Sequence, residues 1–331
     1  MNPNKILGSQ DKKNIIEELL KKAKEDDLIK RALRGDFRKT ELLEDIPMPK
    51  PGDITGLEEI ELDTRGLPKI HKTLAFNPDG DRVLMTTFDN KIDVCLFARE
   101  KPKECFIYYV NRLYSSLVNA AFSPDGNYIA TISDANILRI LGFDKGNLDS
   151  AGAFKDITSI NLPYPANAVA IHPDNRHIAV GLKKLLVMYE FNGKIIEKIH
   201  RQNWESDILD IAFDPKGRYI ALASKVKKDY SATTHKIDSD IIVETRPSHF
   251  VMSVPSLFSV DFSPDGEYLA IGCEDAIEID GFKGNDLKFV AEQGDTGDIY
   301  SVSFDPKGEY LLASTSNGDA KLFKILRAGR K

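Results

Sequence analysis

The chain has 331 residues, of which 42% are hydrophobic and 29% are charged, and its formal net charge is −6 at pH 7. This composition is typical of a soluble globular protein and excludes a disordered chain. No apolar run approaches the roughly 18 residues that a membrane-spanning helix needs, and residues 1–5 lack the apolar core of a secretory signal. The mild acidic balance disfavours nucleic-acid binding, which needs a basic face.

The cysteines give no sign of a covalent framework. Cys95, Cys105 and Cys273 are spread along the chain and include no C-x-x-C pair. We therefore expect neither a disulfide framework nor a zinc site. A reducing, intracellular location fits this use of cysteine, in the cytoplasm or the nucleus.

Residues 1–56 differ in character from the rest of the chain. A helix is predicted over residues 11–24, because its apolar side chains fall on one stripe: Ile15, Ile16, Leu19, Leu20 and Ala23. A second short helix is expected over residues 28–34, followed by an extended proline-rich linker over residues 47–52. The stripe either packs on the domain that follows or docks onto a partner or a second copy of the chain.

One turn signature then recurs six times. Its copies begin at Phe76, Phe122, Ile171, Phe213, Phe262 and Phe304, with spacings of 46, 49, 42, 49 and 42 residues. In each copy a polar residue precedes a proline, which fixes φ, and a glycine follows in the left-handed conformation that reverses the chain. The third copy has Asn175 in place of glycine, and asparagine tolerates the same conformation.

The segments around these turns predict strands. A six-residue apolar segment precedes each turn, and its fifth residue is small in five copies, with Asp261 as the exception. A second strand, usually opened by tyrosine, follows the turn and is apolar on both faces, so it must lie between two other layers. Third and fourth strands fit in the remainder of each repeat, for example at residues 137–143 and 153–160.

Four-stranded sheets that are apolar on both faces bury them by stacking around an axis. We therefore predict an all-β fold, a six-bladed β-propeller over residues 57–326, with seven blades as the alternative. The sixth copy supplies only three strands, and residues 57–63 alternate apolar and acidic side chains as an edge strand does. We expect that segment to complete the last blade, which leaves residues 327–331 as a short basic tail.

The last copy shows a family resemblance. It runs from Gly294-Asp295 through Phe304-Asp305-Pro306-Lys307-Gly308 and ends in Asp319-Ala320-Lys321-Leu322-Phe323. This pattern resembles the repeat of the WD-repeat family, and the resemblance implies a propeller that acts as a scaffold for protein partners. The Trp-Asp dipeptide of that family is missing, and its place is taken by Phe97, Leu141, Tyr189 and Phe323. We expect blade cohesion to rest on apolar packing instead.

No catalytic pattern stands out. The six histidines show no metal-ligand spacing, and the chain has no P-loop, dinucleotide fingerprint or G-x-S-x-G elbow. We therefore expect a non-enzymatic protein without a cofactor. The alternative is a hydrolase or lactonase-type propeller with a metal ion in the central channel, bound by Asp210 and Asp261 with help from Asn119 and Asn167.

The best candidates for partner binding are the connections from the outer strand of one blade to the inner strand of the next. In three adjacent blades they contain aromatic and arginine residues, which dominate interface energies: Arg112, Tyr114, Tyr164, Arg201 and Trp204. The alternative role for each is packing against a neighbouring blade. A further alternative is nucleic-acid binding through the basic stretch 225–230 and the C-terminal tail.

Overall fold

The computed structural model describes residues 52–60, 62, 69–87, 91–97, 105–112, 117–144, 154–226, 229–238, 241–243, 256–283 and 286–329. The predicted N-terminal helices, with the stripe of Ile15, Ile16, Leu19 and Leu20, lie outside these residues. Within the described ranges, no helix is long and apolar enough to cross a membrane.

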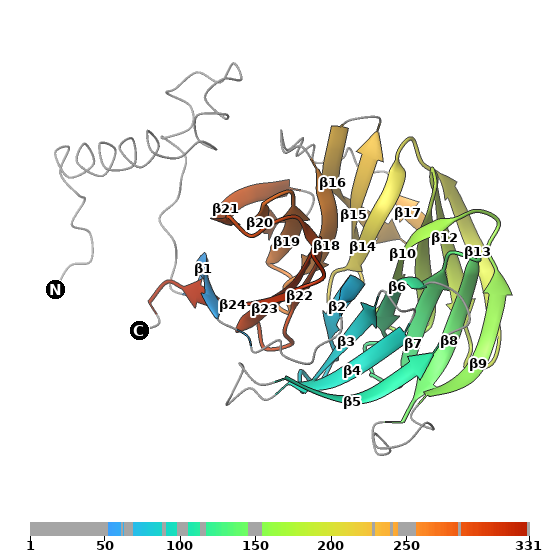
Figure 1. Cartoon of the computed structure of the whole chain (residues 1–331). Coiled ribbons are helices and arrows are strands. Elements are labelled where there is room, and N and C mark those ends of the chain that lie inside the picture. Colours follow the sequence, from blue (N-terminus) through green and yellow to red (C-terminus); the bar gives the residue numbers. More distant parts are fainter. Residues whose placement is uncertain are drawn as a thin grey trace, which may run out of the picture. The chain divides into compact units, whose positions relative to one another are not determined.

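The described residues form six antiparallel sheets of four strands each, which are the blades of a propeller (Figure 1). Blades 1 to 5 use consecutive strands, innermost first. Blade 1 contains β2 (Ile70–Phe76), β3 (Arg82–Thr87), β4 (Lys91–Phe97) and β5 (Cys105–Arg112), and blade 2 contains β6 (Leu117–Phe122), β7 (Tyr128–Ser133), β8 (Ile137–Phe143) and β9 (Phe154–Asn161). Blade 3 contains β10 (Ala166–Ile171), β11 (His177–Leu182), β12 (Leu185–Phe191) and β13 (Ile196–Asn203), and blade 4 contains β14 (Asp207–Phe213), β15 (Tyr219–Val226), β16 (Asp229–Asp238) and β17 (Ile241–Val243).

Blade 5 contains β18 (Leu257–Phe262), β19 (Tyr268–Cys273), β20 (Ala276–Lys283) and β21 (Asp286–Gly294). Blade 6 contains β22 (Ile299–Phe304), β23 (Tyr310–Thr315), β24 (Ala320–Arg327) and, as its outer strand, β1 (Ile54–Ile60). The innermost strand of each blade contacts that of the next, and β22 contacts β2 to close the ring. The predicted six-bladed propeller is therefore confirmed.

The repeated turns have the predicted chemistry. In blades 2 and 5 the serine before the proline accepts the backbone N–H of the tyrosine that opens the second strand, at 2.9 Å from Ser123 Oγ to Tyr128 N and 2.9 Å from Ser263 Oγ to Tyr268 N. The glycine position has positive φ in each turn, including 62° at Asn175. A polar residue, a proline and a left-handed residue thus fix every reversal between the two inner strands of a blade.

Apolar contacts between blades form the core. The second strands are buried on both faces, as in β11 and β19, and their central residues such as Ile271 and Leu311 are fully buried. The side chains that replace the family's tryptophan are buried as well: Phe97, Leu141, Tyr189 and Phe323. These large apolar side chains therefore contribute to the packing between blades, at the position where WD-repeat proteins have tryptophan.

The last blade is closed by β1, which pairs with β24 and places Leu57 opposite Ile325 (Figure 1). The strand begins three residues before the predicted segment and ends at Ile60, and its register with β24 shifts between Ile54 and Gly56. Ile54 is 1% exposed, and its N–H donates to the Tyr268 hydroxyl of blade 5 at 3.2 Å. Arg327 ends β24 and donates to Gly52 O at 2.8 Å, so it belongs to this closure and not to the tail.

One expectation about cysteine is wrong. Cys95 in β4 is in a disulfide bond, whereas Cys273 in β19 is a buried free thiol. Spacing along the chain did not predict this bond because strand pairing decides which thiols meet. The inference of a reducing environment, which rested on the lack of a disulfide, loses that support.

We predict that closure through β1 contributes strongly to stability. Ile54→Ala should lower the free energy of unfolding by roughly 2–4 kcal/mol, because a fully buried side chain leaves a cavity between blades 5 and 6. Glu58→Ala, on an exposed position of the same strand, should change it by less than about 0.5 kcal/mol. Urea denaturation of both variants measures the difference, and equal effects would contradict the role given to β1.

Candidate functional site

A cavity of about 440 Å³ lies along the propeller axis. The innermost strands of the blades line its wall, and the prolines of the six turns lie around it: Pro78, Pro124, Pro173, Pro215, Pro264 and Pro306. The small residues that the sequence places at the fifth position of each inner strand, such as Ala75 and Ala212, border the cavity. The hub is therefore open at these positions and not filled by side chains.

Polar side chains on the inner strands connect neighbouring blades. The residue three places before the end of each inner strand accepts the backbone N–H of the next blade in four cases, at 3.0 to 3.2 Å: Thr73 from Ala120, Asp210 from Val260, Ser259 from Val302 and Ser301 from Leu74. In the other two junctions, Asn119 and Asn167 donate their side-chain amides to the backbone carbonyls of Asn167 and Ile208. These bonds form a ring around the axis that apolar packing alone would not provide.

Lys72 bridges the cavity. Its ammonium donates to Asn167 O at 2.8 Å and to Leu209 O at 3.0 Å, so a side chain from blade 1 is bonded to blades 3 and 4. Burial lowers the pKa of Lys72, and the negative charge of Asp210 opposes that shift. Lys72 thus lies inside the ring, where two backbone carbonyls accept from its side-chain nitrogen and Asp210 interacts with it electrostatically.

Two carboxyl groups share this cavity. Burial raises the pKa of Asp210, although Lys72 and the hydrogen bond from Ser259 Oγ at 2.6 Å oppose the shift. Burial also raises the pKa of Asp261 to about 7, against the hydrogen bond from Phe304 N at 2.7 Å and with a further upward contribution from the charge of Asp210. Asp261 therefore titrates near neutral pH within the ring.

The channel-ion alternative involves these same groups. The Lys72 ammonium already supplies positive charge beside Asp210, and one oxygen of Asp210 accepts from both Ser259 and Val260. The expected helpers Asn119 and Asn167 use their amides to connect the blades. A hard cation at Asp210 and Asp261 would have to compete with Lys72 for the same carboxylate.

Two of the connections singled out in the sequence, those with Tyr164 and Trp204, meet at one end of blade 3. The N–H of Lys183, in the turn between β11 and β12, donates to Pro165 O at 3.4 Å, and Trp204 N donates to Lys184 O at 2.9 Å. These two bonds place the β9–β10 connection, the β11–β12 turn and the β13–β14 connection side by side. Tyr164, in the first of these, is 50% exposed.

The neighbouring segments of this end of blade 3 contain exposed cations. Lys183, Lys184 and Arg201 are exposed, and among the described residues none of the three forms an ion pair. Glu205 is also exposed, so the four side chains together have a net charge of +2 (three cations and one anion). We define the blade-3 rim as Tyr164, Lys183, Lys184, Arg201 and Trp204.

The other predicted rim residues are less accessible or lie elsewhere. Trp204 is half-buried and packs edge-on against the His235 ring of blade 4, with 4.9 Å between ring centroids, so much of it supports the blade junction. Burial lowers the pKa of His235 to about 4. Arg112 ends β5, and Tyr114 lies outside the described residues.

The basic stretch after β15 begins with a packed residue. Lys225 is half-buried, with its ammonium 4.7 Å from the centre of the Tyr230 ring, and Lys227 and Lys228 lie outside the described residues. Lys225 therefore contacts its own blade through a cation–π interaction.

Comparison with known proteins agrees with this architecture. The family model described as "WD domain, G-beta repeat" matches residues 244–277 and 287–324. The β-propeller domain of Cps50 (Swd1) from Myceliophteria thermophila has the same fold, with a TM-score of 0.55 and 13% identity over 83% of this chain and 100% of that one. The chain is a β-propeller whose repeats resemble those of WD-repeat proteins.

Curated relatives of this WD-repeat-like propeller include Protein HIR1 from Eremothecium gossypii, 27% identical over 230 residues, and Protein HIR1 from Kluyveromyces lactis, 26% identical over 230 residues. Each match covers 60% of this chain. The chain spans about a quarter of the length of these relatives, at 27% and 26%.

Sequence reasoning missed Lys72 and the exposed lysines Lys183 and Lys184 of this propeller. The signal for Lys72 was a long cation in an inner strand, where the other copies have Val, Asn, Leu, Phe or Tyr at the same repeat position. The signal for the lysine pair was its place in a two-residue turn between apolar strands.

We predict that the charge on Asp261 destabilises the ring above neutral pH. The folded pKa of about 7 exceeds the ordinary 3.8, so stability should fall as pH rises from about 4 to 7 and then level off. Asp261→Asn keeps an acceptor for Phe304 N and should raise the free energy of unfolding by roughly 1–3 kcal/mol at pH 8, with the gain vanishing toward pH 4.

Asp210→Asn is the matched control, because it removes the charge that offsets Lys72 and should destabilise the protein at pH 8. Urea unfolding at pH 4.5, 6 and 8 compares the three proteins. An Asp261→Asn variant no more stable than the wild type at pH 8 would contradict the assignment.

Proposed function

We propose that this propeller is a non-enzymatic interaction platform that binds an acidic segment of a protein partner at the blade-3 rim. The observation on which this rests is the pair of backbone hydrogen bonds, Lys183 to Pro165 and Trp204 to Lys184, that bring an exposed tyrosine and exposed lysines together. Aromatic and basic side chains at one place on a rigid surface are the usual composition of a binding hot spot.

The charges of the rim favour an acidic partner. Lys183, Lys184 and Arg201 form no ion pair among the described residues, so their charges are available to a ligand. The chain as a whole is acidic, at −6, which makes this local excess of positive charge distinctive. Attraction of this kind speeds encounter and selects partners more than it adds affinity.

The fold supports binding by a preformed surface. The three connections of the rim are short and each is held by a backbone hydrogen bond to its neighbour. Little conformational entropy is then lost on binding, so more of the contact energy appears as affinity. The buried half of Trp204 holds the connection in place while its exposed part contributes to the surface.

The resemblance to WD-repeat proteins supports the proposal that the ligand is a protein. The fold match and the family match together favour a scaffold over a hydrolase, and the proposal includes no catalytic step.

We predict that partner binding depends on Tyr164 and the two lysines. Proteins captured by the full chain from native cells should be identified, and the strongest partner should be purified for titration calorimetry. Tyr164→Ala should weaken its binding at least about tenfold, which is about 1.4 kcal/mol. The double variant Lys183→Glu, Lys184→Glu should weaken it similarly and reduce its dependence on salt.

The controls match each change in chemistry and exposure. Phe289 in blade 5 is also 50% exposed, so Phe289→Ala removes an equally exposed aromatic away from the rim, and Lys324→Glu reverses an exposed charge in blade 6. Both should leave affinity unchanged. Full binding by the rim variants, or equal loss in the controls, would refute the assignment to the blade-3 rim.

A further inference from the structure

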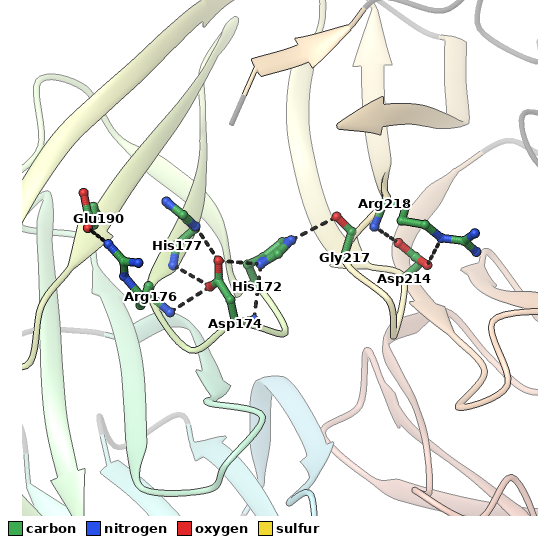
Figure 2. A network of polar contacts seen from close by, with 8 residues as sticks. All are labelled: His172, Asp174, Arg176, His177, Glu190, Asp214, Gly217 and Arg218. Atoms are coloured by element: carbon green, nitrogen blue, oxygen red, sulfur yellow. Dashed lines mark hydrogen bonds and ion pairs between the residues drawn. The ribbon is translucent and has the colours of Figure 1, made fainter. Parts of the chain in front are cut away.

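Besides Asn175, the turn between β10 and β11 in blade 3 has two histidines at positions where the other five copies have none. His172 stands before its proline, where the other copies have Asn, Ser or Asp, and His177 opens its second strand, where they have Arg or Tyr. Along the sequence, the six histidines show no metal-ligand spacing. The structure brings them together with Asp174 (Figure 2).

The histidine is not needed for the hydrogen bond that the turn requires. In blade 4, Asp214 Oδ1 accepts the N–H of Tyr219 at 2.6 Å, and in blade 2 Ser123 Oγ accepts that of Tyr128. In blade 3, Asp174 Oδ1 does this instead, accepting from His177 N at 3.0 Å and from Arg176 N at 2.8 Å (Figure 2). His172 therefore does not accept the turn hydrogen bond that the residue at the same repeat position accepts in blades 2 and 4.

Three donor atoms converge in this turn. His172 Nδ1 lies 3.1 Å from Asp174 Oδ2, and His177 Nδ1 lies 2.6 Å from the same oxygen. One ligand atom from each residue lies within 4.8 Å of the other two, and no other group of His, Cys, Asp or Glu in the described ranges meets that criterion. The side chains are 17%, 36% and 13% exposed for His172, Asp174 and His177, so all three are partly accessible to solvent.

A contact with the neighbouring blade holds the His172 ring in place. His172 Nε2 lies 3.0 Å from Gly217 O of the blade-4 turn, so this nitrogen donates and the lone pair is on Nδ1, toward Asp174 (Figure 2). Histidines that bind metals commonly donate their other N–H to a carbonyl in this way. Gly217 makes the approach feasible, because a Cβ there would lie 2.3 Å from Nε2.

We propose that His172 Nδ1, Asp174 Oδ2 and His177 Nδ1 form a binding site for a zinc ion. Two imidazoles and one carboxylate match the ligands that Zn²⁺ takes at tetrahedral sites with an open position. Tetrahedral ligand atoms lie about 3.3 Å apart, given metal–ligand distances of about 2.0 Å. The 3.1 Å pair is already close to that separation, and the 2.6 Å pair must open by roughly 0.7 Å.

Zinc would replace two contacts of the turn and leave its backbone bonds intact. It would displace the bond from Asp174 N to His172 Nδ1 at 3.2 Å and the 2.6 Å contact between His177 Nδ1 and Asp174 Oδ2. The bonds from Arg176 N and His177 N to Asp174 Oδ1 would remain. The fourth position is open to water or to a donor group from a partner. Because Asn175 Oδ1 accepts from Asp125 N at 2.9 Å and His172 reaches Gly217, the site lies in a turn bonded to both neighbouring blades.

This site is separate from the proposed rim. His177 opens β11, and Leu182, next to Lys183, ends it, so the two lie at opposite ends of one strand. A negative result at either place therefore leaves the other proposal standing.

The test uses the purified full chain after chelator treatment and dialysis. Calorimetric titration with Zn²⁺ should give one site per chain that is lost in the relevant variants, and Co²⁺ should give visible absorption bands typical of tetrahedral coordination. His172→Asn and His177→Tyr should each weaken zinc binding at least about tenfold. Other copies of the repeat have Asn or Tyr at these positions, so both variants should fold.

His200→Ala in β13 is the control that removes a histidine outside the site, and it should bind zinc as the wild type does. Asp174→Asn provides a third variant, since an amide oxygen can still accept the two backbone N–H groups while the charge is lost. Unchanged thermal melting without metal confirms folding of each variant. No saturable binding up to about 100-fold excess of Zn²⁺, or binding that is undiminished in the His172 and His177 variants, would overturn the proposal.

Discussion

The structure depends on one constraint, which is that each blade is apolar on both faces and must be covered on both. A sheet such as blade 3, whose second and third strands are buried almost throughout, cannot be left with a free face in water. Stacking in a closed ring satisfies this requirement for every blade at once. The closing strand β1 and the buried side chains at the tryptophan position both follow from that requirement.

The axis adds a second, polar layer of organisation. Small residues keep the hub open, and this leaves room for Lys72 to reach across it and for side chains to bond the backbone of the next blade. Burying such polar side chains without hydrogen bonds in an apolar core would cost free energy, whereas around the cavity these side chains form hydrogen bonds. Apolar packing determines that the blades stack, and these bonds fix how neighbouring inner strands lie against each other.

Much of the fold could be predicted from the sequence, because the residues of the repeated turn themselves determine where the chain reverses. Proline fixes the reversal at six places together with a glycine in five of them and Asn175 in the other, and the spacing of these turns predicts the number of blades. The register of β1 did not follow, since the irregularity at Ile54–Gly56 depends on the partner strand. The roles of individual side chains were harder to predict. Lys72 and the rim lysines acquire theirs from residues in other strands or other blades, and Asp174 acquires its own because it accepts the turn hydrogen bond in place of His172. The residue type of Trp204 suggested partner binding or packing against a neighbouring blade, and its contact with His235 shows that part of it is packed.

The pairing of β1 with β24 also has a consequence for biosynthesis. Thr55 bonds to Leu326 across 271 residues of sequence, so the first strand of the propeller to be translated has to wait for the last. At ordinary rates of elongation that delay is roughly 15 to 55 s. During it, β1 and the unpaired edge of the growing array are open to wrong partners, including nascent copies on neighbouring ribosomes. The acidic residues Glu58 and Glu59 of β1 are exposed, and their mutual repulsion between chains would discourage such pairing until the correct edge arrives.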